Sequence, residues 1–465
     1  MITPDTLTHF SLDSIEYLAK AITEDASSIT PGEAENLLRT VSPTNPLLPL
    51  DAARFLVTEN REVDEILFHE AGRVKREVFG PRIVIFAPLY LSSRCSNNCL
   101  YCGFRKDNIS LKRKTLSPEE ASEEAGILAL KGYRRLLLVC GESYSRGPAE
   151  YICSIVEEIY SRTDMRILHL NAAPMKVEEM RKIKESGVGV FQVFQETYHR
   201  DTYRRMHPSG NKANYEWRLT CMDRAIEAGF DDLGIGALLG LYEWKFETIS
   251  TILHSIYLKQ RYHTWPHTIS VPRLKPASGT PLEEPPFPVS DRDFLKIVSV
   301  YRLSSPPSGV VISTREHAEL RDRTLSIGAS QISAGSKTTP GGYGPDTLKE
   351  KEGQFYTDDK RGLEEIIRVI IKEGMVPSLC TSCYRSGRTG GAFTQKATRG
   401  EMGDFCHANA LLSIAEYSLL TNDEDLARRC RDLLKREEDM VPVYMKDAFN
   451  KKLSLIMEGK SDERF

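Results

Sequence analysis

Three cysteines lie within eight residues in the segment CSNNCLYC. Cys95, Cys99 and Cys102 are spaced C-x3-C-x2-C. The first residues do not form the basic-then-apolar segment of a secreted protein, so closely spaced cysteines indicate metal or redox chemistry and not disulfides. Three thiolates are one ligand short for a 4Fe-4S cluster, because each of its irons takes its own ligand. The spacing predicts a cluster with one iron open to a substrate or cofactor, with a zinc site or three buried thiols as the alternatives.

A second cysteine group lies toward the C-terminus. Cys380 and Cys383 form a C-x2-C pair, and Cys406 follows after a Gly-rich loop. The pair places two thiolates on one turn, and glycines let the backbone approach an inorganic cluster closely. A zinc site would need a fourth ligand, and the nearest candidate, His407, is awkwardly placed because it adjoins Cys406. We therefore expect a second iron–sulfur cluster here.

The elements that position these cysteines follow a repeating pattern. From residue 82 to 338, short apolar β-rich runs alternate with longer segments of helical period, which is typical of parallel βαβ units. Eight strands with intervening helices predict an α/β fold, a closed (β/α)8 TIM barrel. An open doubly wound sheet is the alternative, but GIGALLG has the wrong last spacing for a dinucleotide fingerprint. The predicted strands are 83–91, 135–142, 166–174, 188–197, 232–241, 267–275, 309–316 and 330–338.

We expect one extension before the barrel in the sequence and another after it. Residues 1–80 look helical, residues 81–375 form the predicted barrel, and residues 376–465 begin with the second cysteine group and end in charged helices. The chain is 40% hydrophobic and 27% charged, with a formal net charge of −3, which argues against nucleic acid as a partner. Its longest uncharged apolar stretch is too short to span a bilayer. We expect a cytoplasmic protein that binds neither nucleic acid nor membrane.

The first cysteine group resembles the motif of radical S-adenosylmethionine (SAM) enzymes, since the aromatic Tyr101 precedes its last cysteine. Cys95 follows the first predicted strand, at the face where barrel enzymes build their sites. The resemblance implies that the open iron binds SAM and that the reduced cluster cleaves SAM to a 5'-deoxyadenosyl radical. It also implies that Tyr101 lies against adenine and that Glu142, after the second strand, meets the SAM amino group. For Tyr101, ordinary aromatic packing is the alternative, and for Glu142 it is an ordinary strand-end turn.

With both cysteine groups in view, the chain resembles the radical SAM tyrosine lyases, in particular the HydG type that matures the active-site cluster of FeFe hydrogenase. The resemblance implies that Cys380, Cys383 and Cys406 hold a 4Fe-4S cluster with an extra iron, bridged by free L-cysteine. It implies that His267 ligates this iron, and we place His267 on the same barrel face as both clusters. A satisfied polar histidine is the alternative. The segments concerned are FAPLYLSSRCSNNCLYCGF, FQVFQETYHRDTYRRMHPSG, MDRAIEAGFDDLGIGALLGLY, PHTISVPRLKPA, ISAGSKTTPGGY and CTSCYRSGRTG.

The resemblance implies L-tyrosine as the substrate. Arg315, after the seventh strand, has the planar fork that binds a carboxylate, while Ser336 and Tyr90 can add hydrogen bonds. A salt bridge of Arg315 with Glu316 or Asp322 is the alternative. The implied reaction cleaves the Cα–Cβ bond of tyrosine to p-cresol and dehydroglycine, then forms CO and cyanide at the second cluster, with the barrel interior as the conduit. The implied partners are a reductant, such as ferredoxin or flavodoxin, and hydrogenase maturation proteins.

Two other hypotheses stay open. A tyrosine lyase of the thiamine pathway would stop at 2-iminoacetate and would need neither the second cysteine group nor His267. A non-catalytic iron–sulfur scaffold would not cleave SAM at all. For His199 and His207, proton transfer and structural hydrogen bonding are both open.

Overall fold

Eight parallel strands close into a barrel, as the sequence predicted. The computed structural model describes residues 7–143, 147–344 and 353–465. Strands β2 to β8 are hydrogen-bonded in order, and β1 closes the ring by pairing with both β8 and β2. The barrel strands are β1 (Arg82–Ser92), β2 (Arg135–Cys140), β3 (Ile167–Asn171), β4 (Val188–Gln192), β5 (Asp232–Gly236), β6 (Thr268–Ser270), β7 (Gly309–Ile312) and β8 (Gln331–Ser333).

Helices surround the barrel because each strand leads into a segment of helical period. In the first βα unit, Ser117 and Glu120 form a capping box with Pro118 at the first helical position, so the helix begins immediately after the long cysteine-bearing loop. Strand β1 is buried along nearly its whole length, as expected for a barrel strand covered on both faces. The helices are α5 (Pro118–Leu130), α6 (Pro148–Arg162), α7 (Val177–Glu185), α8 (Arg200–Met206), α9 (Tyr215–Leu219), α10 (Cys221–Glu227), α11 (Trp244–Tyr262), α12 (Asp291–Ser304), α13 (Ala318–Ile327) and α14 (Leu363–Lys372).

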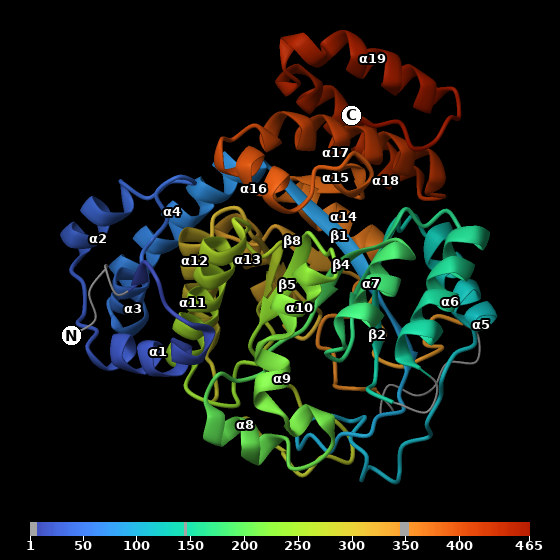
Figure 1. Cartoon of the computed structure of the whole chain (residues 1–465). Coiled ribbons are helices and arrows are strands. Elements are labelled where there is room, and N and C mark those ends of the chain that lie inside the picture. The colour runs from blue at the N-terminus through green and yellow to red at the C-terminus, as the bar shows by residue number, and fades with distance from the viewer. Residues whose placement is uncertain (1–6, 144–146, 345–352) are drawn as a thin grey trace.

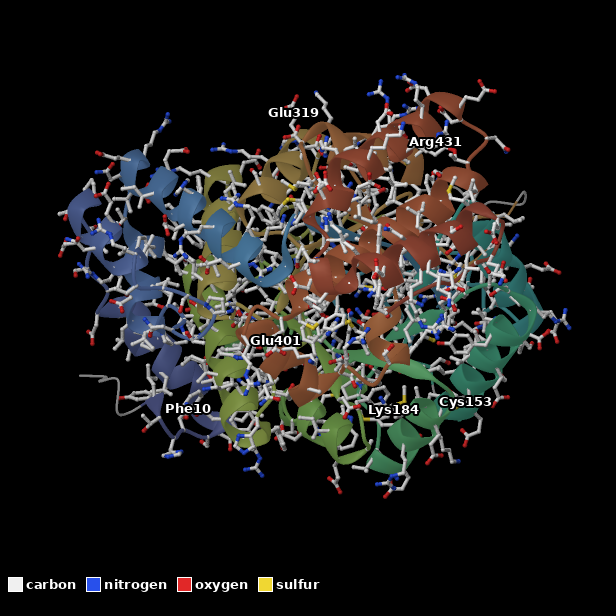
Figure 2. All side chains as sticks on the ribbon, turned by 90° about the horizontal axis from the view of Figure 1, so that it is seen from above. Phe10, Cys153, Lys184, Glu319, Glu401 and Arg431 are labelled. Carbon is white, nitrogen blue, oxygen red and sulfur yellow. The ribbon has the colours of Figure 1, made fainter. Side chains whose placement is uncertain are left out.

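Further helices precede and follow the barrel. The first four pack along its α11–α12 side, while the C-terminal helices lie across the end where β1 begins (Figure 1). Seen from above, the C-terminal helices lie between the side that carries Phe10 and the side that carries Cys153 (Figure 2). No helix in the described part of the chain combines the length and apolar character needed to cross a membrane. These helices are α1 (Ile15–Glu24), α2 (Pro31–Leu38), α3 (Pro49–Val57), α4 (Arg61–Phe79), α15 (Ser382–Arg385), α16 (Gly390–Thr398), α17 (Met402–Leu420), α18 (Glu424–Glu437) and α19 (Val443–Met457).

A ninth strand, β9 (Val376–Ser378), was not predicted, and it corrects one expectation. It runs parallel to β1 and pairs with its first residues, with Val376 opposite Arg82. Cys380 follows β9 directly, so the second cysteine group lies at the N-terminal end of the barrel, whereas Cys95 follows the end of β1. His267 precedes β6 and lies at the N-terminal end too. The placement of His267 on one face with both cysteine groups was therefore wrong: it shares a face with the second group only.

Candidate functional site

The C-terminal end of the barrel holds a cavity of about 210 Å³ whose wall includes Cys95, Cys99 and Cys102. The loop between β1 and α5 carries all three. Burial raises the pKa of the Cys99 thiol to about 12 and that of Cys102 to about 11. At neutral pH these thiols would ionise only with the help of bound positive charge, which is what thiolate ligands gain from iron.

The donor set fits an iron–sulfur cube better than a single ion. No three His, Cys, Asp or Glu side chains in the described ranges converge tightly enough to hold one metal ion. A zinc site needs ligands that all lie within bonding distance of one atom, whereas in a cube each cysteine binds a different iron. The side-chain amide of Asn97 also donates a hydrogen bond to Sγ of Cys95 at 3.7 Å, a contact typical of cluster thiolates.

The two residues expected to contact SAM line this cavity. Tyr101 is buried, and its hydroxyl hydrogen-bonds Nε2 of His207 at 2.8 Å. The carboxylate of Glu142 accepts a hydrogen bond from the side chain of Asn97. Burial raises the pKa of Glu142. Glu142 is thus held in the cavity wall beside the cysteine loop. An ordinary strand-end turn would need no such hydrogen bond from Asn97 to the carboxylate.

A charged network beside these residues was missed in the sequence. Glu196 follows β4 with a φ of 71°, in the left-handed region that is uncommon for residues other than glycine. Its Oε1 lies 2.6 Å from Nζ of Lys212 and 3.2 Å from Arg218. Burial alone would raise the pKa of Glu196, but the two cations lower it to about 2. A carboxylate just after a barrel strand, in FQET, was the signal that could have found it.

Arg315 reaches the same cavity without a carboxylate partner in the described part of the chain. Its guanidinium lies 3.3 Å from the ring centre of Phe355. The alternative salt bridges are not formed, because Glu316 pairs with Arg273 and Asp322 pairs with Arg361. Burial lowers the pKa of Arg315. An unpaired buried guanidinium is costly, and a carboxylate ligand would relieve that cost.

Tyr90 and Ser336, the other expected substrate contacts, line this cavity too. The Tyr90 hydroxyl donates to Oε1 of Gln354 at 2.8 Å. Oγ of Ser336 is buried and has no hydrogen-bond partner among the described residues. The structure thus brings together all three residues predicted for the substrate. It adds Gln354 and Phe355, which no local motif marked because they come from a loop far along the chain.

A second, smaller cavity of about 40 Å³ lies at the N-terminal end of the barrel. Its wall includes Cys380, Cys383, Cys406 and His267. The hydrogen bond with Cys406, and then the nearby guanidinium groups of the chain, lower the pKa of the Cys383 thiol. Three thiols and an imidazole around one electropositive cavity fit an iron–sulfur cluster with a further metal beside it. The cations concerned are Arg82 and Arg388, while Arg135 donates to the carbonyl of Cys380 at 2.8 Å.

His267 is hydrogen-bonded at one ring nitrogen and faces a carboxylate with the other, which has no hydrogen-bond partner among the described residues. Nε2 hydrogen-bonds the hydroxyl of Tyr384 at 2.6 Å, and Nδ1 lies 3.5 Å from Oδ1 of Asp232. Neither partner was predicted. His407, the zinc alternative, instead donates from Nε2 to the carbonyl of Glu437 at 3.2 Å.

The two cavities are successive layers of one barrel interior. On each of four strands, the residue that lines the second cavity is followed two positions later by one that lines the first. Two residues along a strand span about 6.6 Å, so the cavities are separated by a short step. The pairs are Val84 and Phe86, Arg135 and Leu137, Gly309 and Val311, and Gln331 and Ser333.

His199 and His207 have structural positions. His207 is buried between the Tyr101 hydroxyl and the carbonyl of Tyr203, with its pKa lowered far below the usual value by burial. The His199 side chain caps α8 and stacks on Tyr242. Hydrogen bonding and packing thus account for both.

Two family models match the barrel. The radical SAM superfamily model matches residues 89–256, and the model of the biotin and thiamin synthesis associated domain matches residues 270–376. The first of these spans the loop with Cys95, Cys99 and Cys102.

Relatives and solved structures extend the match. The 2-iminoacetate synthase of Escherichia coli (strain K12) is 35% identical over 314 residues, which cover 67% of this chain and 81% of that protein. A crystal structure of HydG, a maturase of the FeFe-hydrogenase, is 39% identical with a TM-score of 0.92, covering 97% of this chain and 100% of that one. HydG from Carboxydothermus hydrogenoformans is 36% identical with a TM-score of 0.84 and the same coverage.

Proposed function

Because this chain belongs to the radical SAM tyrosine lyases, the enzymes related to HydG and 2-iminoacetate synthase, we propose that it carries out two reactions at opposite ends of its barrel. The first cleaves the Cα–Cβ bond of L-tyrosine to p-cresol and dehydroglycine. The second turns dehydroglycine into CO and cyanide for assembly of the FeFe-hydrogenase active-site cluster. The observation that carries the proposal is the second cavity, with three cysteines and His267 in its wall.

At the first site, Cys95, Cys99 and Cys102 would hold a 4Fe-4S cluster, and Glu142 and Tyr101 would bind SAM. When bound, cluster and SAM supply the 5'-deoxyadenosyl radical that removes a hydrogen atom from the tyrosine amine. The protein keeps the reacting groups in a buried cavity and aligns them, which favours the intended reaction over side reactions with water. A reductant such as ferredoxin or flavodoxin provides the electron.

Arg315 would bind the tyrosine carboxylate through its planar fork. Two observations support this role: Arg315 lies in the wall of the cavity, and neighbouring carboxylates pair with other arginines. Tyr90 and Ser336 would complete the polar contacts, because the Ser336 hydroxyl has no other described partner. With the carboxylate fixed, the amine points to a defined place in the cavity.

At the second site, Cys380, Cys383 and Cys406 would hold a 4Fe-4S cluster, and His267 would ligate an extra iron that also carries free L-cysteine. When bound, this iron supplies the site at which dehydroglycine yields CO and cyanide. The barrel interior would be the conduit, since successive residues of four strands line the two cavities. In this proposal, residues 1–80 are a helical extension, 81–375 the barrel and 376–465 the auxiliary-cluster region, and hydrogenase maturation proteins take up the product.

A second candidate is a tyrosine lyase that stops at 2-iminoacetate, which the 35% identity to the E. coli synthase favours. The two candidates differ in products. The test is an assay of the anaerobically reconstituted protein with SAM, tyrosine and dithionite. We expect p-cresol, CO and cyanide together, and p-cresol with glyoxylate but no CO would favour the second candidate. Cys95→Ala should abolish 5'-deoxyadenosine, and a normal yield would contradict the radical SAM assignment. If wild type makes no 5'-deoxyadenosine, the scaffold is favoured.

A further inference from the structure

The loop that follows the first cysteine group carries a local excess of positive charge. Residues 103–116, GFRKDNISLKRKTL, contain five Lys or Arg and one Asp, although the whole chain has a net charge of −3. Lys106 and Lys112 are exposed, as is Arg94 beside the loop. Within the described ranges, none of these three cations pairs with a carboxylate, so their charge faces the solvent. The loop lies at the lower edge of Figure 1, opposite the C-terminal helices.

An apolar side chain projects from the middle of this charged loop. Ile109 is 97% exposed, while Leu111, two residues later, is buried. A single exposed aliphatic residue needs no explanation by itself. Here it lies near Arg94, Lys106 and Lys112, which pair with no carboxylate of the described residues, and the loop is not free to turn Ile109 inward.

The loop is held in this shape by hydrogen bonds from two of its side chains to backbone carbonyls inside and outside it. The guanidinium of Arg113 donates to the carbonyls of Ser93 and Phe104 at 2.6 and 2.7 Å. The side chain of Asn108 donates to the carbonyls of Gly103 and Ser278 at 2.8 and 2.9 Å. Because the bonds flank Ile109, its exposure is fixed by the fold. Preorganisation of this kind lowers the entropic cost of binding a partner.

The charged surface lies close to the first cluster site. The amide of Arg105 donates to the carbonyl of Cys102 at 3.0 Å, and that of Lys106 donates to the carbonyl of Asn97 at 2.7 Å. Four residues of chain cannot span more than about 14 Å, so Lys106 lies within that distance of Cys102. The cysteine thiols themselves lie in the wall of an inner cavity. An external electron donor therefore has a short approach to this site at the loop.

We propose that this basic surface, formed by Arg94, Lys106, Ile109 and Lys112, is the docking surface for an acidic one-electron carrier protein. The inference rests on the proposed function, because it needs a redox cluster at Cys95, Cys99 and Cys102. In the step, the carrier is oxidised by one electron, the cluster is reduced by one electron, and no bond is made or broken. Unpaired cations speed the encounter with an acidic protein. A small contact with one apolar residue and a charged rim suits the weak, transient complexes of electron carriers.

The experiment compares two reductants on the full-length, reconstituted enzyme. Reduced flavodoxin, an acidic protein, tests the surface, and the methyl viologen radical cation bypasses it. We expect Lys106→Glu with Lys112→Glu to lower the flavodoxin-driven rate of 5'-deoxyadenosine formation about tenfold and to weaken its salt dependence. Ile109→Ala should lower that rate less. The viologen-driven rate should stay at the wild-type value, because a small cation is not attracted to the lysines.

Controls come from the opposite end of the barrel. Leu130, the last residue of α5, and Lys131 form a similar exposed pair, so Leu130→Ala with Lys131→Glu should change neither rate. Binding of oxidised flavodoxin, measured by titration calorimetry without turnover, should weaken only in the loop variants. Unchanged flavodoxin binding and rate in Lys106→Glu with Lys112→Glu would overturn the inference, as would an equal loss with both reductants. If wild type makes no 5'-deoxyadenosine even with viologen, the proposed function fails instead.

Discussion

Asp232 and His267 form a carboxylate–imidazole pair at the N-terminal end of the barrel, with Oδ1 of Asp232 3.5 Å from Nδ1 of His267. Asp232 is itself fixed, because the same oxygen accepts the amide of Gly390 at 2.8 Å. At this separation Nδ1 makes no hydrogen bond, while Nε2 hydrogen-bonds the hydroxyl of Tyr384 beside the second cavity. A carboxylate in this position can orient a metal-binding histidine.

Asp232→Asn should loosen the extra iron without disturbing tyrosine cleavage. Asparagine keeps an oxygen for the Gly390 amide but removes the charge that orients His267. We expect CO formation to fall about tenfold or more, while p-cresol changes little. The check is iron per chain after reconstitution and gel filtration, together with both products. His267→Ala should have the same or a larger effect, and wild-type iron content and CO in Asp232→Asn would contradict the orienting role.

Cys383→Ala should separate the two halves of the reaction. Cys383 lies in the second cavity, at the opposite end of the barrel from Cys95. We expect p-cresol to form at close to the wild-type rate and CO to be lost, because the second cluster lacks a ligand. Quantifying both products in one reaction tests this. Equal losses of p-cresol and CO would mean that the second cysteine group is only structural.

Arg315→Lys should weaken tyrosine binding. Lysine keeps the charge but lacks the planar fork, so kcat/KM for tyrosine should fall about 10- to 100-fold. Arg361→Lys is a matched control, since Arg361 already pairs with Asp322 and Asp359. The control should change thermal stability and leave KM for tyrosine unchanged. The same KM for tyrosine in Arg315→Lys and wild type would exclude Arg315 as the carboxylate contact.

The barrel could be predicted because its signals are local. Each strand and helix has its own hydrophobic period, and Ser117 with Glu120 marks a helix start within four residues. Strand β9 could not be found in this way. It has three residues, too few for a period, and it forms because the start of β1 offers a partner far away in the sequence.

The sequence predicts those parts of the candidate site whose residues lie close together along the chain. Cys95, Cys99 and Cys102 lie on one loop, so their spacing alone indicates a cluster. The neighbours of His267 come from β5 and α15 and have no shared motif. The barrel face predicted for His267 was wrong. A residue that precedes a parallel strand lies at the N-terminal end of the barrel, whereas Cys95, which follows a strand, lies at the C-terminal end. That rule follows from strand direction, so the sequence could have placed His267 correctly.

The last prediction concerns pH and a buried carboxyl group away from both cysteine groups. Glu247 of α11 accepts hydrogen bonds from the hydroxyl of Thr197 and from the amide of Tyr198. Burial raises its pKa from 4.5 to about 8. The folded state therefore holds the proton more tightly than the unfolded state does. The stability linked to this proton is fully present below about pH 4.5 and is lost as pH rises toward about 8.

Glu247→Gln removes this titration, so the variant should gain stability relative to wild type by about 1.4 kcal/mol per pH unit between those two values. Above about pH 8 the gain should level off, because Glu247 is then ionised in both states. Anaerobic thermal melts at about pH 5.5, 7 and 8.5 measure the difference. Glu157→Gln on α6 is the control for the substitution itself, because this side chain is exposed. A difference for Glu247→Gln that does not vary with pH would show that this carboxyl group titrates alike in the folded and unfolded chain.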